Sequence, residues 1–145
     1  MAACRKAGFD ADPSKRIQTD LWLKFIVLAT NSAITAATRL PFGKLRGDAD
    51  VMALFEAATK EVVAVGRAKG IALPEDAAQL NMSFLAGAPP AMMASMAHDL
   101  IRGNRIELPW LSGKVVELGR KHGVPTPTHA FMYAALKPYT MGNPA

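Results

Sequence analysis

Apolar residues recur every three or four positions through much of this chain, which is the spacing of one face of an α-helix. The pattern is clearest in two long segments, Leu21 to Arg39 and Val51 to Gly70. Asp20 precedes the first segment, and Asp48 or Asp50 precedes the second. Because aspartate is favoured at helix N-termini, these positions predict where the two long helices begin.

Proline, glycine and acidic residues divide the second half of the chain into shorter helices. The run 74–76 (Pro-Glu-Asp) opens one helix, and Pro89-Pro90 breaks the chain after it. Further helices are expected over 91–102, 110–122 and 128–136, and a short one over 2–7. No run alternates between apolar and polar residues for long enough to predict a strand. The pattern therefore predicts an all-α fold, a bundle of several helices.

Length and composition support one globular domain. The chain has 145 residues, of which 50% are hydrophobic and 20% charged. The single cysteine, Cys4, excludes a disulfide framework and a multi-cysteine zinc site. The three histidines lie far apart in sequence and lack the spacing of a helical zinc motif, so no metal is expected.

The net charge of +5 does not indicate a nucleic-acid partner. Lysine and arginine are scattered, and aromatic residues make up only 7% of the chain, whereas nucleic-acid surfaces combine a basic stripe with stacking aromatics. A solvated basic surface or a preference for a small anion explains the charge. The longest uncharged stretch, 77–97, is too polar and too broken to span a membrane. We therefore expect a cytoplasmic protein that binds neither nucleic acid nor membrane.

Three groups of polar residues are candidates for chemistry. Lys24 lies among apolar neighbours and is either a proton donor or acceptor in a pocket, or a surface lysine whose stem covers an apolar rim. Asn31 and Ser32 follow two turns later on the same expected helix, where they would line the same cleft.

The third group lies in the second half of the chain. Ser95 and Asp99 are one helical turn apart, and Glu107 follows a Gly-Asn break. From the sequence alone, ordinary capping and surface roles explain this group better than a catalytic or binding role.

These residues carry a resemblance to a known family. The runs are Leu-Trp-Leu-Lys-Phe (21–25), Asn-Ser-Ala-Ile-Thr-Ala (31–36), Ser-Met-Ala-His-Asp-Leu (95–100), Gly-Asn-Arg-Ile-Glu-Leu (103–108) and Gly-Val-Pro-Thr-Pro-Thr (123–128). In order and spacing they resemble the C-terminal domain of the ketopantoate reductase (2-dehydropantoate 2-reductase) family. The fold implied is the helical bundle of that domain, similar to the C-terminal domains of 6-phosphogluconate dehydrogenases.

The resemblance implies half of a two-domain enzyme that reduces a 2-keto acid to a 2-hydroxy acid with NADPH. Lys24 would be the general acid, and Ser95 would bind the substrate carboxylate or hydroxyl. Glu107 would hold the cofactor ribose or the substrate hydroxyl, and Asp99 would belong to the same site. Asn31, Ser32 and Asp99 are assigned to substrate binding.

The resemblance also divides the chain. Residues 1–19 are expected to be the remnant of a nucleotide-binding Rossmann domain and its linker, 20–137 the helical substrate domain, and 138–145 a frayed tail. Without the Rossmann domain, we expect no tightly bound NADP(H) and no activity. The implied setting is a cytoplasmic homodimer in pantothenate biosynthesis. The alternative is a non-enzymatic helical module that dimerises or binds a partner through the apolar surface around Trp22 and Phe25.

Two departures from the family pattern concern the substrate. The family places asparagines four and eight residues after the lysine, whereas this chain has Leu28 and Ser32 there. Asn31 is one position out of register, about 100° around the helix from Ser32, so it does not replace that contact. A 2-keto acid more apolar than ketopantoate is therefore an open alternative.

Overall fold

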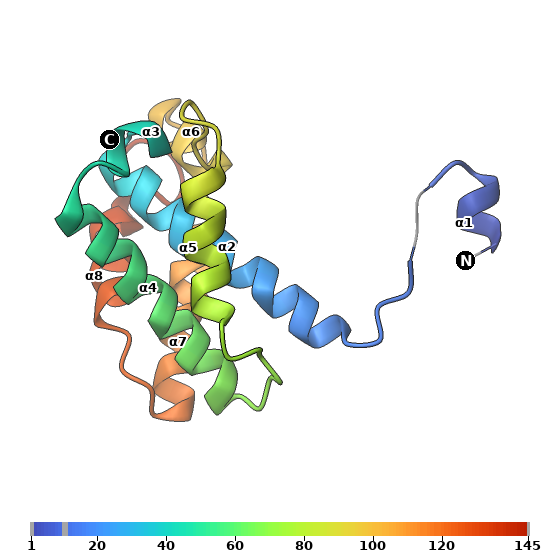
Figure 1. The fold of residues 1–145 in the computed structure, drawn as a ribbon. Helices are drawn as coiled ribbons and strands as arrows, with labels where there is room; N and C mark the ends of the chain where they lie inside the picture. Colours follow the sequence, from blue (N-terminus) through green and yellow to red (C-terminus); the bar gives the residue numbers. More distant parts are fainter. Residues whose placement is uncertain (1, 10–11, 145) are drawn as a thin grey trace.

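In the computed structural model, which describes residues 2–9 and 12–144, every regular element is a helix (Figure 1). The all-α prediction is therefore confirmed. The elements are α1 (Ala2–Lys6), α2 (Ile17–Thr38), α3 (Phe42–Leu45), α4 (Ala49–Ala68), α5 (Ala77–Gly87), α6 (Ser95–Ile101), the 3₁₀ helix η1 (Leu108–Trp110), α7 (Ser112–His122), α8 (Pro127–Leu136) and the 3₁₀ helix η2 (Lys137–Tyr139).

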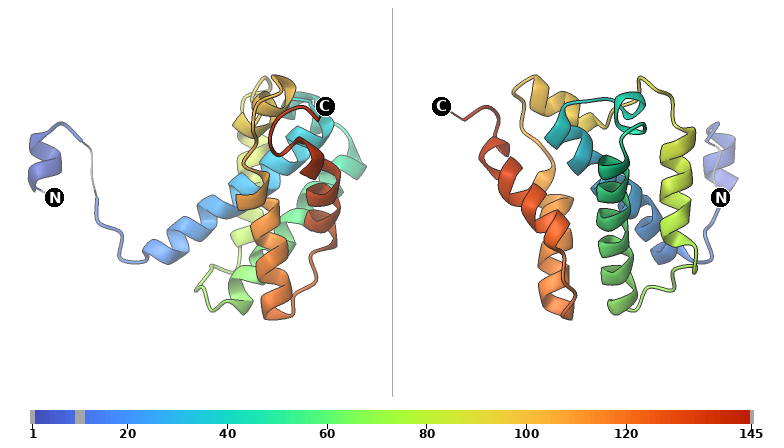
Figure 2. Two further views of the ribbon diagram at one scale, coloured as in Figure 1. Left: turned by 180° about the vertical axis from the view of Figure 1, so that it is seen from behind. Right: turned by 60° about the vertical axis from the view of Figure 1, so that its left-hand side comes forward.

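Helix α2 is the central element of the bundle. It packs against α4, α6, α7 and α8, and its N-terminal half projects beyond the body of the molecule (Figure 1). Helix α4 packs against α5 on one side and against α7 and α8 on the other, and Figure 2 shows α4 and α5 standing side by side. The C-terminal half of α2 is therefore enclosed by other helices.

The buried half of α2 owes its close packing to small side chains. Ala29, Ala33 and Ala36 are fully buried, as is Ile34. The helix is long and apolar enough to cross a membrane by length and composition, but 56% of its most apolar window is buried inside the protein. This is weak evidence for a membrane span, because the core helix of a soluble protein passes the same test.

The two long helices begin in different ways. Asp48 caps α4, and its Oδ1 accepts hydrogen bonds of 3.0 Å from the backbone N–H groups of Asp50 and Val51. Helix α2, in contrast, begins one turn before the predicted start. Asp20 lies within the first turn and forms an ion pair of 3.4 Å with Arg16. A carboxylate is favourable there because it faces the positive end of the helix dipole, even without capping the helix.

Helix α6 is shorter than predicted because the segment 88–94 pairs with α3 instead of continuing the helix. The N–H of Phe42 donates to the carbonyl of Met92 at 3.0 Å, and the N–H of Gly43 donates to that of Pro90 at 2.9 Å. A Cβ on Gly43 would lie 2.7 Å from the Cβ of Pro90, so this close approach requires glycine. Arg46 donates to the carbonyls at the end of α5. We call the segment 88–94 the Pro-Pro loop.

Thr140 and Gly142, near the end of the chain, contact the segment that follows α6. Residues 138–145 are predicted to fray, yet the carbonyl of Thr140 accepts a hydrogen bond of 3.1 Å from the N–H of Ile106. Gly142 is buried, and a Cβ there would lie 2.8 Å from the carbonyl oxygen of Gly103. The segment that follows α6 is thereby held between the bundle and the C-terminal residues.

Candidate functional site

A pocket of about 210 Å³ lies between α2, the Pro-Pro loop, α3 and α5. Three predicted substrate-binding residues line it, namely Asn31 and Ser32 from α2 and Ser95 from the start of α6. The remaining side chains are apolar: Val27, Leu28, Phe42, Phe84, Met92, Met93 and Ala94. The fold thus joins two segments that are more than sixty residues apart in sequence.

The amide of Asn31 belongs to a buried polar network. Its Nδ2 lies 3.5 Å from Oδ1 of Asn81 on α5, whose Nδ2 donates to the hydroxyl of Thr59 on α4 at 2.8 Å. All three side chains are buried. The Oδ1 atom of Asn31 has no hydrogen-bond partner among the described residues. The network fixes Asn31 beside the pocket and leaves one buried acceptor unused.

Lys24 lies on the exposed face of α2 and does not line the pocket. It is one helical turn before Leu28, which does line it, so the two side chains share a face of the helix. Within the described residues, the ammonium group of Lys24 forms no ion pair.

Asp99 and Glu107 do not line this pocket. Asp99 is half-buried, and its Oδ1 accepts a hydrogen bond of 3.3 Å from Nδ2 of Asn104, which holds the turn after α6. Glu107 is exposed at the start of η1, where its backbone carbonyl accepts from the N–H of Trp110 at 3.0 Å. Of the six predicted site residues, the structure gathers three in one pocket.

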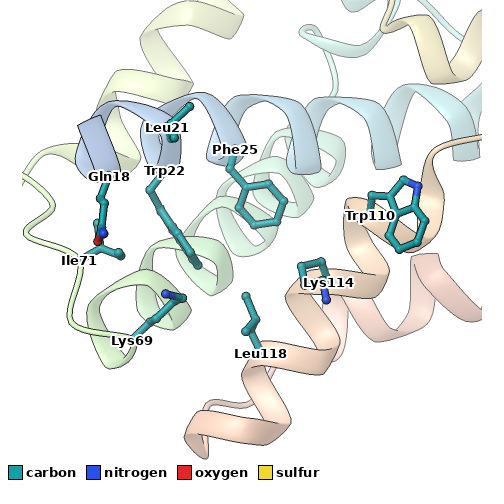
Figure 3. Close-up of a pocket in the computed structure, with 9 residues that line it drawn as sticks. All are labelled: Gln18, Leu21, Trp22, Phe25, Lys69, Ile71, Trp110, Lys114 and Leu118. Atoms are coloured by element: carbon teal, nitrogen blue, oxygen red, sulfur yellow. The ribbon is translucent and has the colours of Figure 1, made fainter. Parts of the chain in front are cut away.

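A second concavity, of about 400 Å³, lies beside the projecting half of α2 (Figure 3). We call it the tryptophan groove. Leu21, Trp22 and Phe25 from α2 form one wall, and Trp110 and Leu118 form the other. The side chains of Lys69 and Lys114 also line it (Figure 3).

Trp22 anchors the projecting half of α2 to α4. Its indole N–H donates to the carbonyl of Val62 at 3.2 Å, and its ring packs against Gly66, where a Cβ would collide with it. Phe25 meets the ring edge-on, with the ring centroids 5.4 Å apart. Trp110, on the opposite wall, is 63% exposed. Sequence patterns identify the apolar surface at Trp22 and Phe25 but do not bring Trp110 to it.

His129 is a buried polar residue that the sequence does not single out. Its Nε2 donates to the carbonyl of Ala58, and its Nδ1 accepts from the hydroxyl of Ser112, both at 3.2 Å, which suits a neutral ring. Burial lowers the pKa of His129 below its usual value, against the opposing effects of Glu61 and the Ala58 carbonyl. Glu61 also accepts the backbone N–H groups of Thr128 and His129, at 2.7 and 3.0 Å.

These hydrogen bonds link α8, which carries His129, to Ala58 and Glu61 of α4 and to Ser112 of α7. Across the described residues, no group of three histidine, cysteine, aspartate or glutamate side chains is arranged to hold a metal ion.

The profile of the C-terminal part of ketopantoate reductase (PanE/ApbA) matches residues 16–140. This chain belongs to the ketopantoate reductase family. The family's C-terminal domain covers the whole bundle from α2 to η2, including every predicted site residue.

Known family members agree in sequence and in fold. The 2-dehydropantoate 2-reductase of Caulobacter vibrioides is 30% identical over 81% of this chain, and that of Mycobacterium tuberculosis is 31% identical over 85%. The crystal structure of a ketopantoate reductase from Ralstonia eutropha superposes with a TM-score of 0.88, at 32% identity over 96% of this chain. These matches cover 40%, 41% and 46% of the respective relatives. The chain thus spans less than half the length of these ketopantoate reductases.

Proposed function

We propose that this chain is the substrate-binding and catalytic half of an NADPH-dependent oxidoreductase that reduces a 2-keto acid to a 2-hydroxy acid. A nucleotide-binding domain would supply the other half. One observation carries the proposal: Asn31, Ser32 and Ser95 meet in a pocket next to the face of α2 that presents Lys24. Membership of the ketopantoate reductase family supplies the reaction class.

Each residue has a proposed task. Lys24 donates a proton to the carbonyl oxygen as that oxygen gains negative charge, and its positive charge stabilises the same oxygen. Ser95 donates a hydrogen bond to the substrate carboxylate or hydroxyl. Asn31 and Ser32 form the polar side of the pocket, and Asp99 holds the turn after α6.

Glu107 is the residue of this chain proposed to hold the cofactor. Its exposed carboxylate fits a ribose hydroxyl, since carboxylates accept hydrogen bonds from such groups. NADPH, when bound, supplies the hydride that reduces the carbonyl carbon. Most of its binding surface would come from the nucleotide-binding domain, so weak binding to this chain alone is expected.

A chimera tests the proposal. The N-terminal half of the Ralstonia eutropha enzyme is joined to residues 16–145, and NADPH oxidation is followed with a panel of 2-keto acids. Changing Lys24→Gln should lower kcat by roughly 10²- to 10⁴-fold, because a positioned general acid contributes about that much. Lys121→Gln, at an exposed lysine near the end of α7, is the matched control and should keep full activity.

Two results would contradict the proposal. If a folded chimera that binds NADPH reduces no 2-keto acid, the reaction class is wrong. If Lys24→Gln is as active as Lys121→Gln, the role of Lys24 is wrong.

A second candidate function is self-association through the tryptophan groove. The exposure of Trp110 and Leu21, 63% and 59%, favours it, since apolar patches of this kind mark interaction surfaces. One structural relative, the ketopantoate reductase of Staphylococcus aureus, is described as dimeric. Sedimentation equilibrium should show a dimer that Trp110→Ser weakens. A monomer at every concentration would exclude this function.

A further inference from the structure

The pocket that contains Asn31, Ser32 and Ser95 has a largely apolar lining. Among the residues that the structure describes, no charged side chain lines it. The apolar side chains come from four segments, α2, α3, α5 and the Pro-Pro loop, so the apolar lining is not confined to one helix. A group that enters it leaves water and gains apolar contacts in several directions.

The rim of the pocket is apolar and open to solvent. Leu28, Phe84 and Met92 are 43%, 40% and 39% exposed. Each presents apolar surface that a bound molecule would cover, and covering apolar surface is favourable in proportion to its area. Methionine side chains also adapt to the shape of a ligand, and Met92 and Met93 stand next to each other in the wall.

The polar groups lie where they orient a ligand without filling the pocket. Lys24 is one turn from Leu28 on the same face of α2, and Ser95 is exposed at the start of α6. A 2-keto acid whose carbonyl oxygen faces Lys24 and whose carboxylate is held by Ser95 has its side chain directed at the apolar wall. The volume of about 210 Å³ exceeds the roughly 150 Å³ of an apolar protein cavity that binds benzene, so a phenyl-sized side chain fits.

We propose that this pocket selects 2-keto acids with a bulky apolar side chain, such as an aromatic ring, over ketopantoate, whose side chain ends in a hydroxyl. The inference rests on the proposed function, because it names the substrate class of the same site. An apolar wall gains from each added carbon, whereas a terminal hydroxyl gains only if it finds a partner.

Ligand titrations of the 145-residue chain test the preference directly. With ¹³C-labelled methionine methyl groups, phenylpyruvate and ketopantoate are titrated separately and followed by NMR. Phenylpyruvate should shift the Met92 and Met93 signals and bind at least about tenfold more tightly, since one methylene in an apolar pocket already gives about that factor.

Matched variants on α5 locate the ligand. Phe84 lines the pocket, whereas Leu80, one turn earlier and 47% exposed, does not. Phe84→Ala should weaken phenylpyruvate binding by about tenfold, and Leu80→Ala should leave it unchanged. Leu28→Asn, which places an amide at the rim, should narrow or reverse the preference for phenylpyruvate over ketopantoate.

Equal affinities, tighter binding of ketopantoate, or unmoved Met92 and Met93 signals would each overturn the inference. The proposed function is judged separately, by NADPH oxidation in the chimera. If the chimera reduces ketopantoate in preference to phenylpyruvate, the proposed function is supported and the proposed preference for apolar side chains is wrong. If a folded chimera that binds NADPH reduces no 2-keto acid of the panel, the proposed function itself is wrong.

Discussion

The two halves of α2 have similar apolar sequences but opposite surroundings. From Ala29 to Ala36 every residue is buried, including the polar side chains of Asn31, Ser32 and Thr35. From Ile17 to Leu28, most large apolar residues stay in contact with solvent: Ile17 and Leu21 are 56% and 59% exposed, whereas Ile26 is buried. Hydropathy alone does not distinguish the two halves, because burial depends on which neighbours reach each half.

The buried half of α2 therefore supports the core, whereas the exposed half presents side chains at the surface. Helix α2 as a whole packs against α4, α6 and α8, with Trp22 anchoring its exposed half to α4, and the exposed half carries Lys24. The exposed half also contributes Leu28 to the pocket and Leu21 to the tryptophan groove. Exposed apolar residues on a helix that also bears a proposed catalytic lysine are expected where a ligand or a second domain covers the surface.

The largest expected change in the free energy of unfolding comes from a substitution in the buried half of α2. Ile34→Ala removes a fully buried side chain from the core and should lower the free energy of unfolding by about 2–5 kcal/mol. Leu21→Ala, in the exposed half, is the control and should change it by less than about 0.5 kcal/mol. Urea denaturation monitored by circular dichroism measures both. Similar losses for the two variants would break the contrast between the halves.

A substitution with the next largest expected effect tests how the exposed half of α2 is attached to α4. Gly66→Ala places a methyl group against the Trp22 ring, which must move away from α4. Overpacking of this kind costs about 1–3 kcal/mol, and the shift of the indole should change the tryptophan fluorescence. Gly47→Ala is the control, because a Cβ at Gly47 meets nothing within 4 Å. An unchanged spectrum for Gly66→Ala would mean that Trp22 does not anchor α2.

A smaller change in the free energy of unfolding, dependent on pH, is expected from the buried side chain of His129. Because burial lowers the folded-state pKa of this side chain, the unfolded chain takes up a proton near pH 6.5, whereas the folded chain does so only at lower pH. The free energy of unfolding should therefore fall as the pH drops below about 6.5, by at most about 1.4 kcal/mol per pH unit from this residue.

Denaturation at several pH values, with His129→Gln as the comparison, measures this slope. The variant should show a flatter dependence. An NMR titration of the His129 ring in the unmodified chain gives a second readout, and a pKa at or above the usual histidine value would contradict the prediction.

The smallest effect on stability is expected at Lys24. Its side chain is exposed and forms no ion pair with a described residue, so Lys24→Gln should change the free energy of unfolding by less than about 0.5 kcal/mol. The same variant should remove most activity from the chimera. A strongly destabilised Lys24→Gln would instead assign the lysine a structural role.

Sequence patterns predict the helices more accurately than their ends. Asp48 caps α4 as expected, because its carboxylate reaches N–H groups only two and three residues away. The start of α2 and the length of α6 are predicted wrongly. For α6, the reason is distant in sequence: the N–H groups of Phe42 and Gly43 bind the carbonyls of the Pro-Pro loop.

The pocket residues likewise divide into those that local sequence motifs predict and those that only the packing of distant segments brings to the pocket. The motifs identify Asn31, Ser32 and Ser95, which the fold brings together, but they give no signal for Phe84, Met92 or Met93 in the same pocket. Apolar residues of this kind have no distinctive local pattern, so their meeting depends on how α5 and the Pro-Pro loop pack. The roles of Lys24, Asp99 and Glu107 stay predictions.

By itself, the sequence determined the all-α class, the family and the order of the helices, because periodicity, capping and motif spacing are local properties of the chain. Only the tertiary structure decided which half of α2 is enclosed and which residues wall the pocket. It also decided that His129 is buried against Ser112 and Ala58. These features depend on contacts between segments far apart in the chain, and such contacts form only when the helices pack.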